Sequence, residues 1–406
     1  MSGLDAFSQP RRICRGAALT WVCTSVLVAG GAIGFFTDHG RAGRAGRTSS
    51  EVAAGATPKA PARQGRPGHA NHEDVEKAAA AAMAAGKSPM EAAERAVSRS
   101  GDRWGAVYSR GEYEELKEAL DGEYTGVGLW ARRERDGRIE VAKVQSGSPA
   151  AAAGIRAGDR LSSVDGTEVD GRPVTEVVSL LRGDATDARA GTAVTLGLRR
   201  GTRAWSETLR RARLSTDSVT VHKLPGSGGT VIKIASFTKD TGDAVRTAVR
   251  QAPADSGIIL DLRGNSGGLV DEAVTTASAF LDGGLVATYD VDGRQRSLHA
   301  DTDGDTGRPL VALVDGGTMS AAEMLTGALQ DRGRAVVVGS RTFGKGSIQM
   351  PTRLPDGSVA ELTVGHYRTP SGHAVDGRGI TPDLEADRQP LQRAETVLSG
   401  LGDDTQ

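Results

Sequence analysis

The chain has 406 residues, of which 38% are hydrophobic and 25% charged, and its formal net charge is −1. This length is enough for two folded domains, and the composition is that of an ordinary globular protein. The near-zero net charge gives no reason to expect nucleic acid as a partner. Both cysteines, Cys14 and Cys23, lie in the N-terminal segment. We therefore expect no disulfide, metal or other cofactor in the folded part.

The N-terminal segment predicts a membrane anchor. Residues 1–15 carry arginines and precede an apolar run over residues 16–36. At about 1.5 Å per residue, that run is long enough to cross a hydrocarbon core of about 30 Å. Its length, and the lack of a small-residue cleavage site close behind it, favour a transmembrane anchor over a cleaved signal peptide. We expect a cytoplasmic N-terminus and an extracytoplasmic remainder, with secretion after cleavage as the alternative.

Two further segments precede the first strands. Residues 37–72 are rich in Gly, Ala, Arg, Pro, Ser and Thr, which is typical of a disordered linker. Residues 73–125 contain Ala-rich stretches that predict helices. One of these helices opens with Ser88-Pro89 and places Glu91 in its first turn.

From residue 126 the apolar residues alternate as in strands, for example in "RIEVAKV" over residues 138–144. The loop "GVGL" and the later run "SPAAAAGIRAGDRLSSVDG" make residues 126–213 resemble a PDZ domain. In such a domain a peptide adds as a strand to the sheet edge, and N–H groups of a small-residue loop receive its terminal carboxylate. The residues expected to bind that carboxylate are Gly126, Val127, Gly128 and Leu129.

Residues 214–390 predict an α/β core. Apolar runs such as "GIILDL" and "LVALVDGG" have the pattern of buried strands, and they alternate with amphipathic helices. The last residues, 391–406, are expected to form a polar tail.

The stretch "GNSGG" at residues 264–268 resembles the nucleophile loop of chymotrypsin-type serine proteases, with Ser266 as the attacking residue. That mechanism also needs a histidine and a buried aspartate. His222 is the only histidine among residues 116–265, and "VTVHKLPG" predicts a strand and a turn around it. Chymotrypsin-like barrels are all β, whereas this loop follows an apolar strand and precedes a helix. These features favour a role for Ser266 as a small loop residue.

A second serine has a more suitable context. Ser320 follows a buried strand and a Gly-rich turn and opens a helix, a position that exposes its side chain to the positive helix end. Lys345 follows the next strand, which returns the chain to the same sheet edge. A serine nucleophile needs an adjacent base, and lysine is a base only when burial lowers its pKa from about 10.4 to about 7–8.

Taken in order, the motifs of residues 75–385 resemble those of the carboxyl-terminal processing peptidases. These are the tail-specific, PDZ-containing serine proteases of family S41. The motifs that carry the resemblance are "YTGVGL", "VIKIASF", "DLRGNSGGL", Ser320, "TFGKGSIQ", "YRTPSG" and "GITPD".

The resemblance assigns roles to individual residues. It implies that Ser320 is the nucleophile, Lys345 the general base and Gln349 the residue that orients the lysine. It also implies an oxyanion hole formed by the backbone N–H groups of Gly267 and Ala321.

The resemblance also implies a fold and a function. It indicates a multidomain α/β (α+β) protein whose crotonase/ClpP-like protease core, residues 73–125 and 214–390, is interrupted by the PDZ domain. We expect an extracytoplasmic serine endopeptidase that binds protein C-termini and cleaves near the tail through an acyl-enzyme. The alternative is a catalytically inactive PDZ adaptor at the membrane. Expected partners are substrates with apolar C-terminal tails, with a homo-oligomer or an adaptor protein left open. The family usually has small residues where Met319 stands, which leaves the preference of the neighbouring subsite open.

Overall fold

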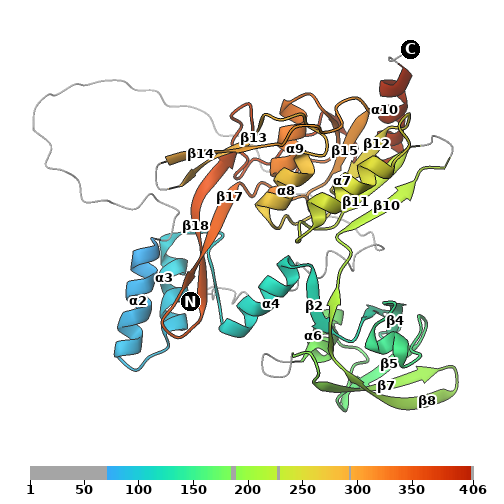
Figure 1. Ribbon diagram of the computed structural model, residues 1–406. Helices are drawn as coiled ribbons and strands as arrows, with labels where there is room; N and C mark the ends of the chain where they lie inside the picture. Colours follow the sequence, from blue (N-terminus) through green and yellow to red (C-terminus); the bar gives the residue numbers. More distant parts are fainter. Residues whose placement is uncertain (1–70, 184–188, 226–228, 292–293, 404–406) are drawn as a thin grey trace, which may run out of the picture.

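The computed structural model describes residues 71–183, 189–225, 229–291 and 294–403 (Figure 1). The expected anchor at residues 16–36 lies outside them. Within these ranges, no helix has both the length and the apolar character needed to cross a membrane.

A six-stranded sheet forms the centre of the larger unit, in the order β10-β11-β12-β15-β16-β19. Every neighbouring pair is parallel except β10 with β11. The central strands are buried on both faces, which explains their uninterrupted apolar sequences. The strands are β10 (Val219–Lys223), β11 (Thr230–Ile234), β12 (Ile258–Asp261), β15 (Leu310–Val314), β16 (Val336–Gly339) and β19 (Leu384–Glu385).

Helices cover both faces of this sheet. On one face, α7 (Thr241–Gln251), α8 (Val270–Ala277) and α9 (Ala321–Asp331) share a hydrophobic core with Ile258 and Leu260 of β12. Ile259, between those two residues, points to the opposite face and another core. The alternation follows from the two-residue period of a strand.

The second face is covered by α10 (Pro390–Asp403), where a polar tail was expected. Ala394 and Leu398 are buried beside Ile259 and Val311. The expectation of a tail from residue 391 is therefore wrong as far as residue 403. The apolar residues of this segment recur at helical spacing, so the helix has one apolar face. That face packs against the side of the sheet that α7, α8 and α9 leave uncovered.

A second, antiparallel sheet has the order β1-β18-β13-β14, with β17 also paired to β18. The end of the β17–β18 hairpin packs with α2 (His72–Ala84) and α3 (Pro89–Ser100) in a separate small core. The N-cap of α3 is Ser88, whose side chain accepts the N–H of Glu91. The strands are β1 (Ala106–Tyr108), β13 (Leu285–Val291), β14 (Arg294–His299), β17 (Ser347–Arg353) and β18 (Val359–Arg368).

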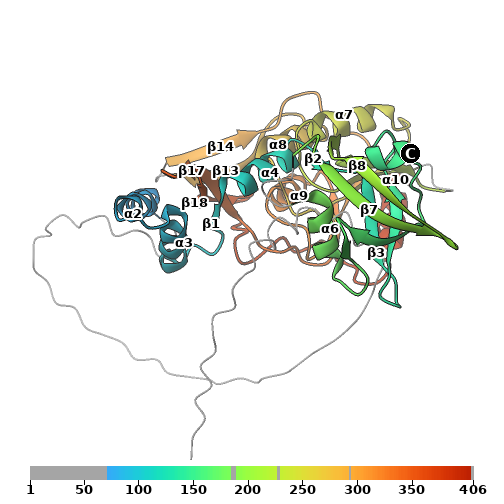
Figure 2. The ribbon, with the colours of Figure 1, turned by 90° about the horizontal axis from the view of Figure 1, so that it is seen from below.

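The expected PDZ segment forms its own unit with its own core (Figures 1 and 2). The chain enters it through β2 (Glu123–Gly126) and leaves through β9 (Ala212–Ser215), which pair with each other. Helix α4 (Arg110–Leu120) precedes β2. The sheet has the order β3-β4-β5-β7-β8, with β6 paired to β5. Its elements are β3 (Leu129–Arg133), β4 (Ile139–Val144), α5 (Pro149–Ala152), β5 (Arg160–Val164), β6 (Thr167–Glu168), α6 (Val174–Arg182), β7 (Ala193–Arg200) and β8 (Arg203–Arg210).

Candidate active site

Ser320 stands at the N-cap of α9 in a strained backbone conformation, with φ 54° and ψ −120°. Residues with a side chain rarely adopt positive φ, and such strain concentrates at functional sites. Ser320 and Glu323 form the capping-box pair of this helix, in which the backbone N–H of Ser320 donates to Oε2 of Glu323 at 2.9 Å. The Ser320 side chain thus stands at the positive end of α9.

The loop after β12 lies directly against Ser320. A Cβ atom added to Gly267, where φ is +96°, would lie 2.9 Å from Cβ of Ser320 and 3.2 Å from the backbone nitrogen of Ala321. Only glycine allows this approach. In this conformation the Gly267 N–H donates to Oδ1 of the buried Asn265 at 2.8 Å. Ala321 is the first residue of α9, where N–H groups lack helical acceptors.

The surroundings of Ser266 differ from those of a chymotrypsin-type nucleophile. Its loop follows β12 of a mainly parallel sheet. His222 is exposed on the edge strand β10. Asp261 instead pairs with Arg263 of the same loop at 2.6 Å. Burial would raise the pKa of Asp261, but Arg263 and Lys233 hold it below its ordinary value.

Lys345 lies between β16 and β17, and its side chain is half-buried. Burial lowers the pKa of Lys345, against the attraction of the Glu361 and Glu323 carboxylates. The amine Nζ lies 5.3 Å from the centroid of the Trp104 ring. In the described part of the chain, no hydrogen bond joins this amine to the Ser320 hydroxyl.

Two buried side chains hold Ser320 and Lys345 together through their backbones. Oε2 of Glu323 accepts the N–H groups of Ser320 at 2.9 Å and of Lys345 at 2.8 Å. Oε1 accepts the Thr342 hydroxyl at 2.5 Å and the Gly344 N–H at 2.7 Å. Burial raises the pKa of Glu323, and these four hydrogen bonds oppose that rise.

Tyr367 of β18 also bridges Ser320 and Lys345, but through their carbonyl oxygens instead of their N–H groups. Its hydroxyl lies 2.8 Å from the Ser320 carbonyl oxygen and 3.1 Å from that of Lys345. The motif "YRTPSG" begins at Tyr367, but the sequence assigned this tyrosine no role of its own, because its partners lie 22 and 47 residues away along the chain. For Glu323 the serine-to-glutamate spacing of a capping box was a usable signal.

Gln349 lies on β17 opposite Thr363 of β18, next to a break in the strand register. Its Nε2 donates to the Ser347 hydroxyl at 2.8 Å and to the Thr363 hydroxyl at 3.4 Å. The structure therefore places Gln349 on the hairpin that follows Lys345, with its amide hydrogen-bonded across that hairpin in this conformation.

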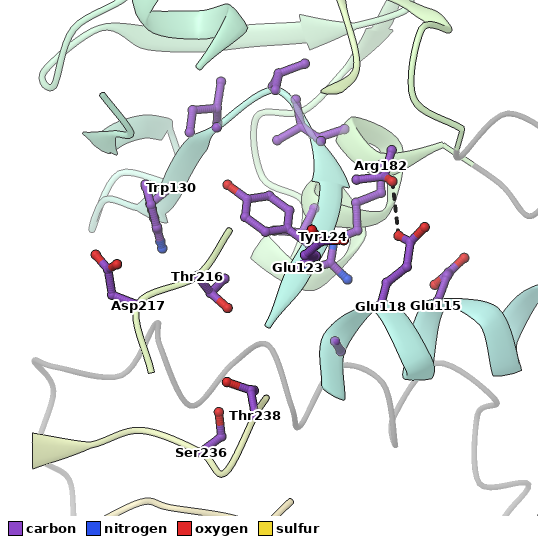
Figure 3. A pocket seen from close by; sticks show the side chains of 18 of the residues that line it. Glu115, Glu118, Glu123, Tyr124, Trp130, Arg182, Thr216, Asp217, Ser236 and Thr238 are labelled. Atoms are coloured by element: carbon purple, nitrogen blue, oxygen red, sulfur yellow. Dashed lines mark hydrogen bonds between the residues drawn. The ribbon is translucent and has the colours of Figure 1, made fainter. Parts of the chain in front are cut away.

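The four expected carboxylate-binding residues line a cavity of about 150 Å³ between the PDZ unit, α4 and the larger unit (Figure 3). Helix α6 supplies Val178, Leu181 and Arg182 to one wall, and α4 supplies Glu115 and Glu118 to another. Thr125 directly precedes the loop of residues 126–129, and its hydroxyl donates to Oε2 of Glu118 at 3.1 Å. Burial raises the pKa of Glu115, and Arg182 opposes that rise.

Comparison with known proteins agrees with the sequence motifs. Residues 229–386 match the model of peptidase family S41, and residues 140–200 match a PDZ domain model. The chain is 34% identical over 318 residues to a "Probable CtpA-like serine protease" of Staphylococcus aureus (strain bovine RF122 / ET3-1), covering 77% of this chain and 62% of the relative. A protein with the same description from Staphylococcus haemolyticus (strain JCSC1435) is 32% identical over 331 residues, covering 79% of this chain and 65% of the relative. The chain thus spans less than two thirds of the length of these relatives.

Two solved structures are also similar. A photosystem II D1 C-terminal processing protease is 31% identical, with 77% of this chain and 86% of that chain covered and a TM-score of 0.48. A structure described as an S41 protease from Bacteroides fragilis NCTC 9343 is 18% identical, with 78% and 91% covered and a TM-score of 0.52. The latter likeness concerns the fold alone.

Proposed function

Because the chain belongs to peptidase family S41 and carries a PDZ domain, we propose that it is a serine endopeptidase that cleaves proteins near their C-termini with a Ser320–Lys345 dyad. One observation carries the proposal. The N–H groups of Ser320 and Lys345, 25 residues apart in sequence, donate to the same buried oxygen of Glu323. Glu323 therefore brings the backbone of the predicted nucleophile next to the backbone of the predicted base.

The proposed reaction is acyl transfer in two steps. The Ser320 oxygen attacks the scissile carbonyl carbon while the Lys345 amine takes the hydroxyl proton. The carbon–nitrogen bond then breaks, the lysine returns the proton to the leaving amine, and an ester to Ser320 remains. Water, deprotonated by the same amine, then attacks the ester carbon; the bond to the Ser320 oxygen breaks, and the lysine returns the proton to that oxygen. The Lys345 side chain turns from Trp104 toward Ser320 for these transfers.

The electrostatics of the site support Lys345 as the base. Proton transfer requires a neutral amine, and burial lowers the pKa of Lys345. Backbone N–H groups of Ala321 and Gly267 would stabilise the oxyanion, the latter after release from Asn265. Gln349 would accept a hydrogen bond from the turned amine without adding a negative charge that raises its pKa.

In this proposal the PDZ unit receives the substrate tail. The tail would add as a strand beside β3, with its carboxylate at the loop of residues 126–129 and its apolar side chains against α6. The groove wall formed by α4 belongs to the segment that precedes the PDZ unit, so an occupied groove can act on the remainder of the protein. A tail that binds one arrangement of α4 better would shift the population toward it.

We also propose that the enzyme is tethered to the membrane by residues 16–36, with its folded part outside the cytoplasm. The arginines before this run and its length support the proposal. The test is alkaline carbonate extraction of membranes from cells producing the full chain, combined with external protease added to spheroplasts. Full release by carbonate, or protection of the folded part from the external protease, would contradict it.

The activity test uses the full chain in detergent and an unfolded reporter protein with an apolar C-terminal tail. We expect cleavage by the wild-type protein and by Ser266→Ala, and none by Ser320→Ala or Lys345→Ala. The same reporter with a charged tail serves as the control for tail recognition. Binding of the apolar tail without cleavage would favour the inactive adaptor. Undiminished cleavage by Ser320→Ala would refute the nucleophile assignment.

A further inference from the structure

A short segment outside the matched peptidase residues contacts the predicted base. Residues 102–105 connect α3 to β1, whereas the family match covers residues 229–386. The segment follows the end of α3 and continues into β1, which pairs with β18. It thereby reaches the β17–β18 hairpin beside Lys345.

Asp102 anchors this segment to the hairpin. Its buried carboxylate accepts the N–H and the hydroxyl of Thr363, each at 2.8 Å, and the N–H groups of Trp104 at 3.1 Å and Gly105 at 2.9 Å. Burial would raise the pKa of Asp102, but these hydrogen bonds hold it below its ordinary value. Thr363 in turn accepts a hydrogen bond from Gln349. Hydrogen bonds therefore connect Asp102, through Thr363, to Gln349, the residue predicted to orient the lysine.

Close packing also restrains the segment. A Cβ atom added to Gly105 would lie 2.8 Å from Cγ1 of Val97 and 2.9 Å from Cγ of Asp102. The backbone next to Trp104 is thus restrained from both α3 and Asp102.

The Trp104 ring lies over the amine of Lys345, 5.3 Å from Nζ to the ring centroid. Phe343 stands beside the indole, with ring centroids 5.8 Å apart and an interplanar angle of 59°. The Arg103 guanidinium carbon lies 4.7 Å from the same indole centroid. Trp104 thus stands between the amine and Phe343, which is itself 41% exposed.

Two carboxylates act on the amine, Glu361 of β18 and Glu323 of α9. Arg103 contacts the Trp104 ring. The two carboxylates favour the protonated amine, whereas burial favours the neutral amine and has the larger effect on the pKa of Lys345. Burial likewise raises the pKa of Glu361, which weakens its attraction for the amine. Excluding water is therefore what makes this lysine a base.

We propose that Trp104 is a positioning residue for the general base: its ring excludes water from the Lys345 amine and holds the side chain beside Ser320 until the amine turns toward the hydroxyl. The proposal rests on the assignment of Lys345 as the base. It makes the segment before the PDZ unit a part of the proteolytic site.

Two effects of the ring act in opposite directions. A cation–π contact at a partly exposed site favours the protonated amine by about 0.5–1 kcal/mol. Desolvation can lower a lysine pKa by up to about 3–5 units. Removing the ring should therefore raise the pKa of Lys345, since readmitted water outweighs the lost contact.

The test compares Trp104→Leu, Trp104→Phe and the wild-type full chain in the cleavage assay between pH 5 and pH 10. The acidic limb of kcat/KM reports the base in the free enzyme. We expect this limb to move to higher pH in Trp104→Leu, so that kcat/KM below the limb falls about tenfold per pH unit of movement. Trp104→Phe keeps a smaller ring and should give an intermediate movement.

Trp205→Leu is the matched control, because Trp205 also lies under arginine side chains but belongs to the PDZ unit. Its limb should stay in place. An unmoved limb in Trp104→Leu would overturn the proposal, whether or not Tm falls; if that variant does not fold, an unmoved limb in Trp104→Phe would do the same. Ser320-dependent cleavage with an unmoved limb contradicts only this inference, whereas equal cleavage by Ser320→Ala contradicts the proposed function itself.

Discussion

The buried carboxylate of Glu323 accepts the backbone N–H of Lys345 at 2.8 Å, on the same oxygen that accepts the N–H of Ser320. The two residues with the expected chemical roles are thus joined through their peptide groups. Tyr367 joins the carbonyl groups of the same pair. The backbones of Ser320 and Lys345 are therefore held together by hydrogen bonds that do not involve the proposed proton transfer.

Replacing Glu323 should destabilise the site severely. Glu323→Ala leaves four donors without their acceptor, and an unpaired buried donor costs about 1–3 kcal/mol. We expect urea denaturation to show a loss of at least about 3 kcal/mol and the cleavage assay to show no measurable turnover. Glu112→Ala is the matched control, since Glu112 is the equivalent capping glutamate of α4. Its loss should be about 0.5–2 kcal/mol with turnover retained; equal effects of the two variants would contradict the role of Glu323.

Tyr367→Phe should separate positioning from stability. The buried ring remains, and only the hydroxyl that reaches the Ser320 and Lys345 carbonyl groups is lost. We expect the free energy of unfolding to fall by about 1–3 kcal/mol. Steady-state kinetics should show a lower kcat with little change in KM, because the dyad backbone shifts while tail binding is untouched. Tyr113→Phe on α4 serves as the control, and an unchanged kcat in Tyr367→Phe would count against the bridge.

Glu361 should shift the pH dependence of cleavage in the direction opposite to burial, because its carboxylate raises the pKa of Lys345 whereas burial lowers it. Its negative charge favours the protonated Lys345 and so raises the pKa of that amine. In Glu361→Gln the pKa of Lys345 should fall, and the acidic limb of kcat/KM should move to lower pH. At a pH below the wild-type limb, the variant should then be the faster enzyme. A limb that moves to higher pH would show that Glu361 does not act on the amine.

Gly267→Ala should abolish cleavage without affecting tail binding. The added Cβ would meet Cβ of Ser320 at 2.9 Å, and φ at this position is +96°. We expect no turnover but an unchanged Kd for a tail peptide, measured by fluorescence anisotropy. Gly307→Ala is the control, because a Cβ there meets no atom within 4 Å and φ is not positive. Substantial turnover in Gly267→Ala would mean that this loop does not adjoin the reacting atoms.

Glu118→Gln should strengthen tail binding. The carboxylate of Glu118 accepts the Thr125 hydroxyl beside the loop that is predicted to receive the tail carboxylate. Removing its charge removes like-charge repulsion, which is worth about 1 kcal/mol for two unit charges about 4 Å apart in water and is screened by salt. The Kd of a tail peptide should fall severalfold at low salt, and less at 0.5 M salt. Glu114→Gln on the same helix should leave the Kd unchanged; equal Kd values for Glu118→Gln and wild type would contradict this placement of the tail.

The local patterns of the chain predicted much of the architecture. Uninterrupted apolar runs such as residues 310–314 became strands buried on both faces. Ser88-Pro89 opened a helix. Ser320 stands at the start of α9, as its Gly-rich turn indicated. These features depend on neighbours within one or two turns of chain, so a single sequence contains them.

Such local patterns could not predict contacts between segments that are far apart in sequence. Trp104 and Lys345 are 241 residues apart, and the PDZ unit lies between them in sequence. The helix at residues 390–403 was not predicted, because its apolar residues are buried only by packing against a sheet face formed by distant segments.

The sequence by itself determined the residues on which the proposed chemistry depends: a serine at a helix start, a lysine after the next strand and glycines where the backbone must approach closely. Only the tertiary structure decided the environment of that chemistry. In the proposed mechanism Lys345 is a base because burial lowers its pKa; Trp104 lies over its amine, and the carboxylates of Glu361 and Glu323 act on it from two other parts of the chain. Desolvation and electrostatic interactions depend on distance in space, which spacing along the chain does not specify.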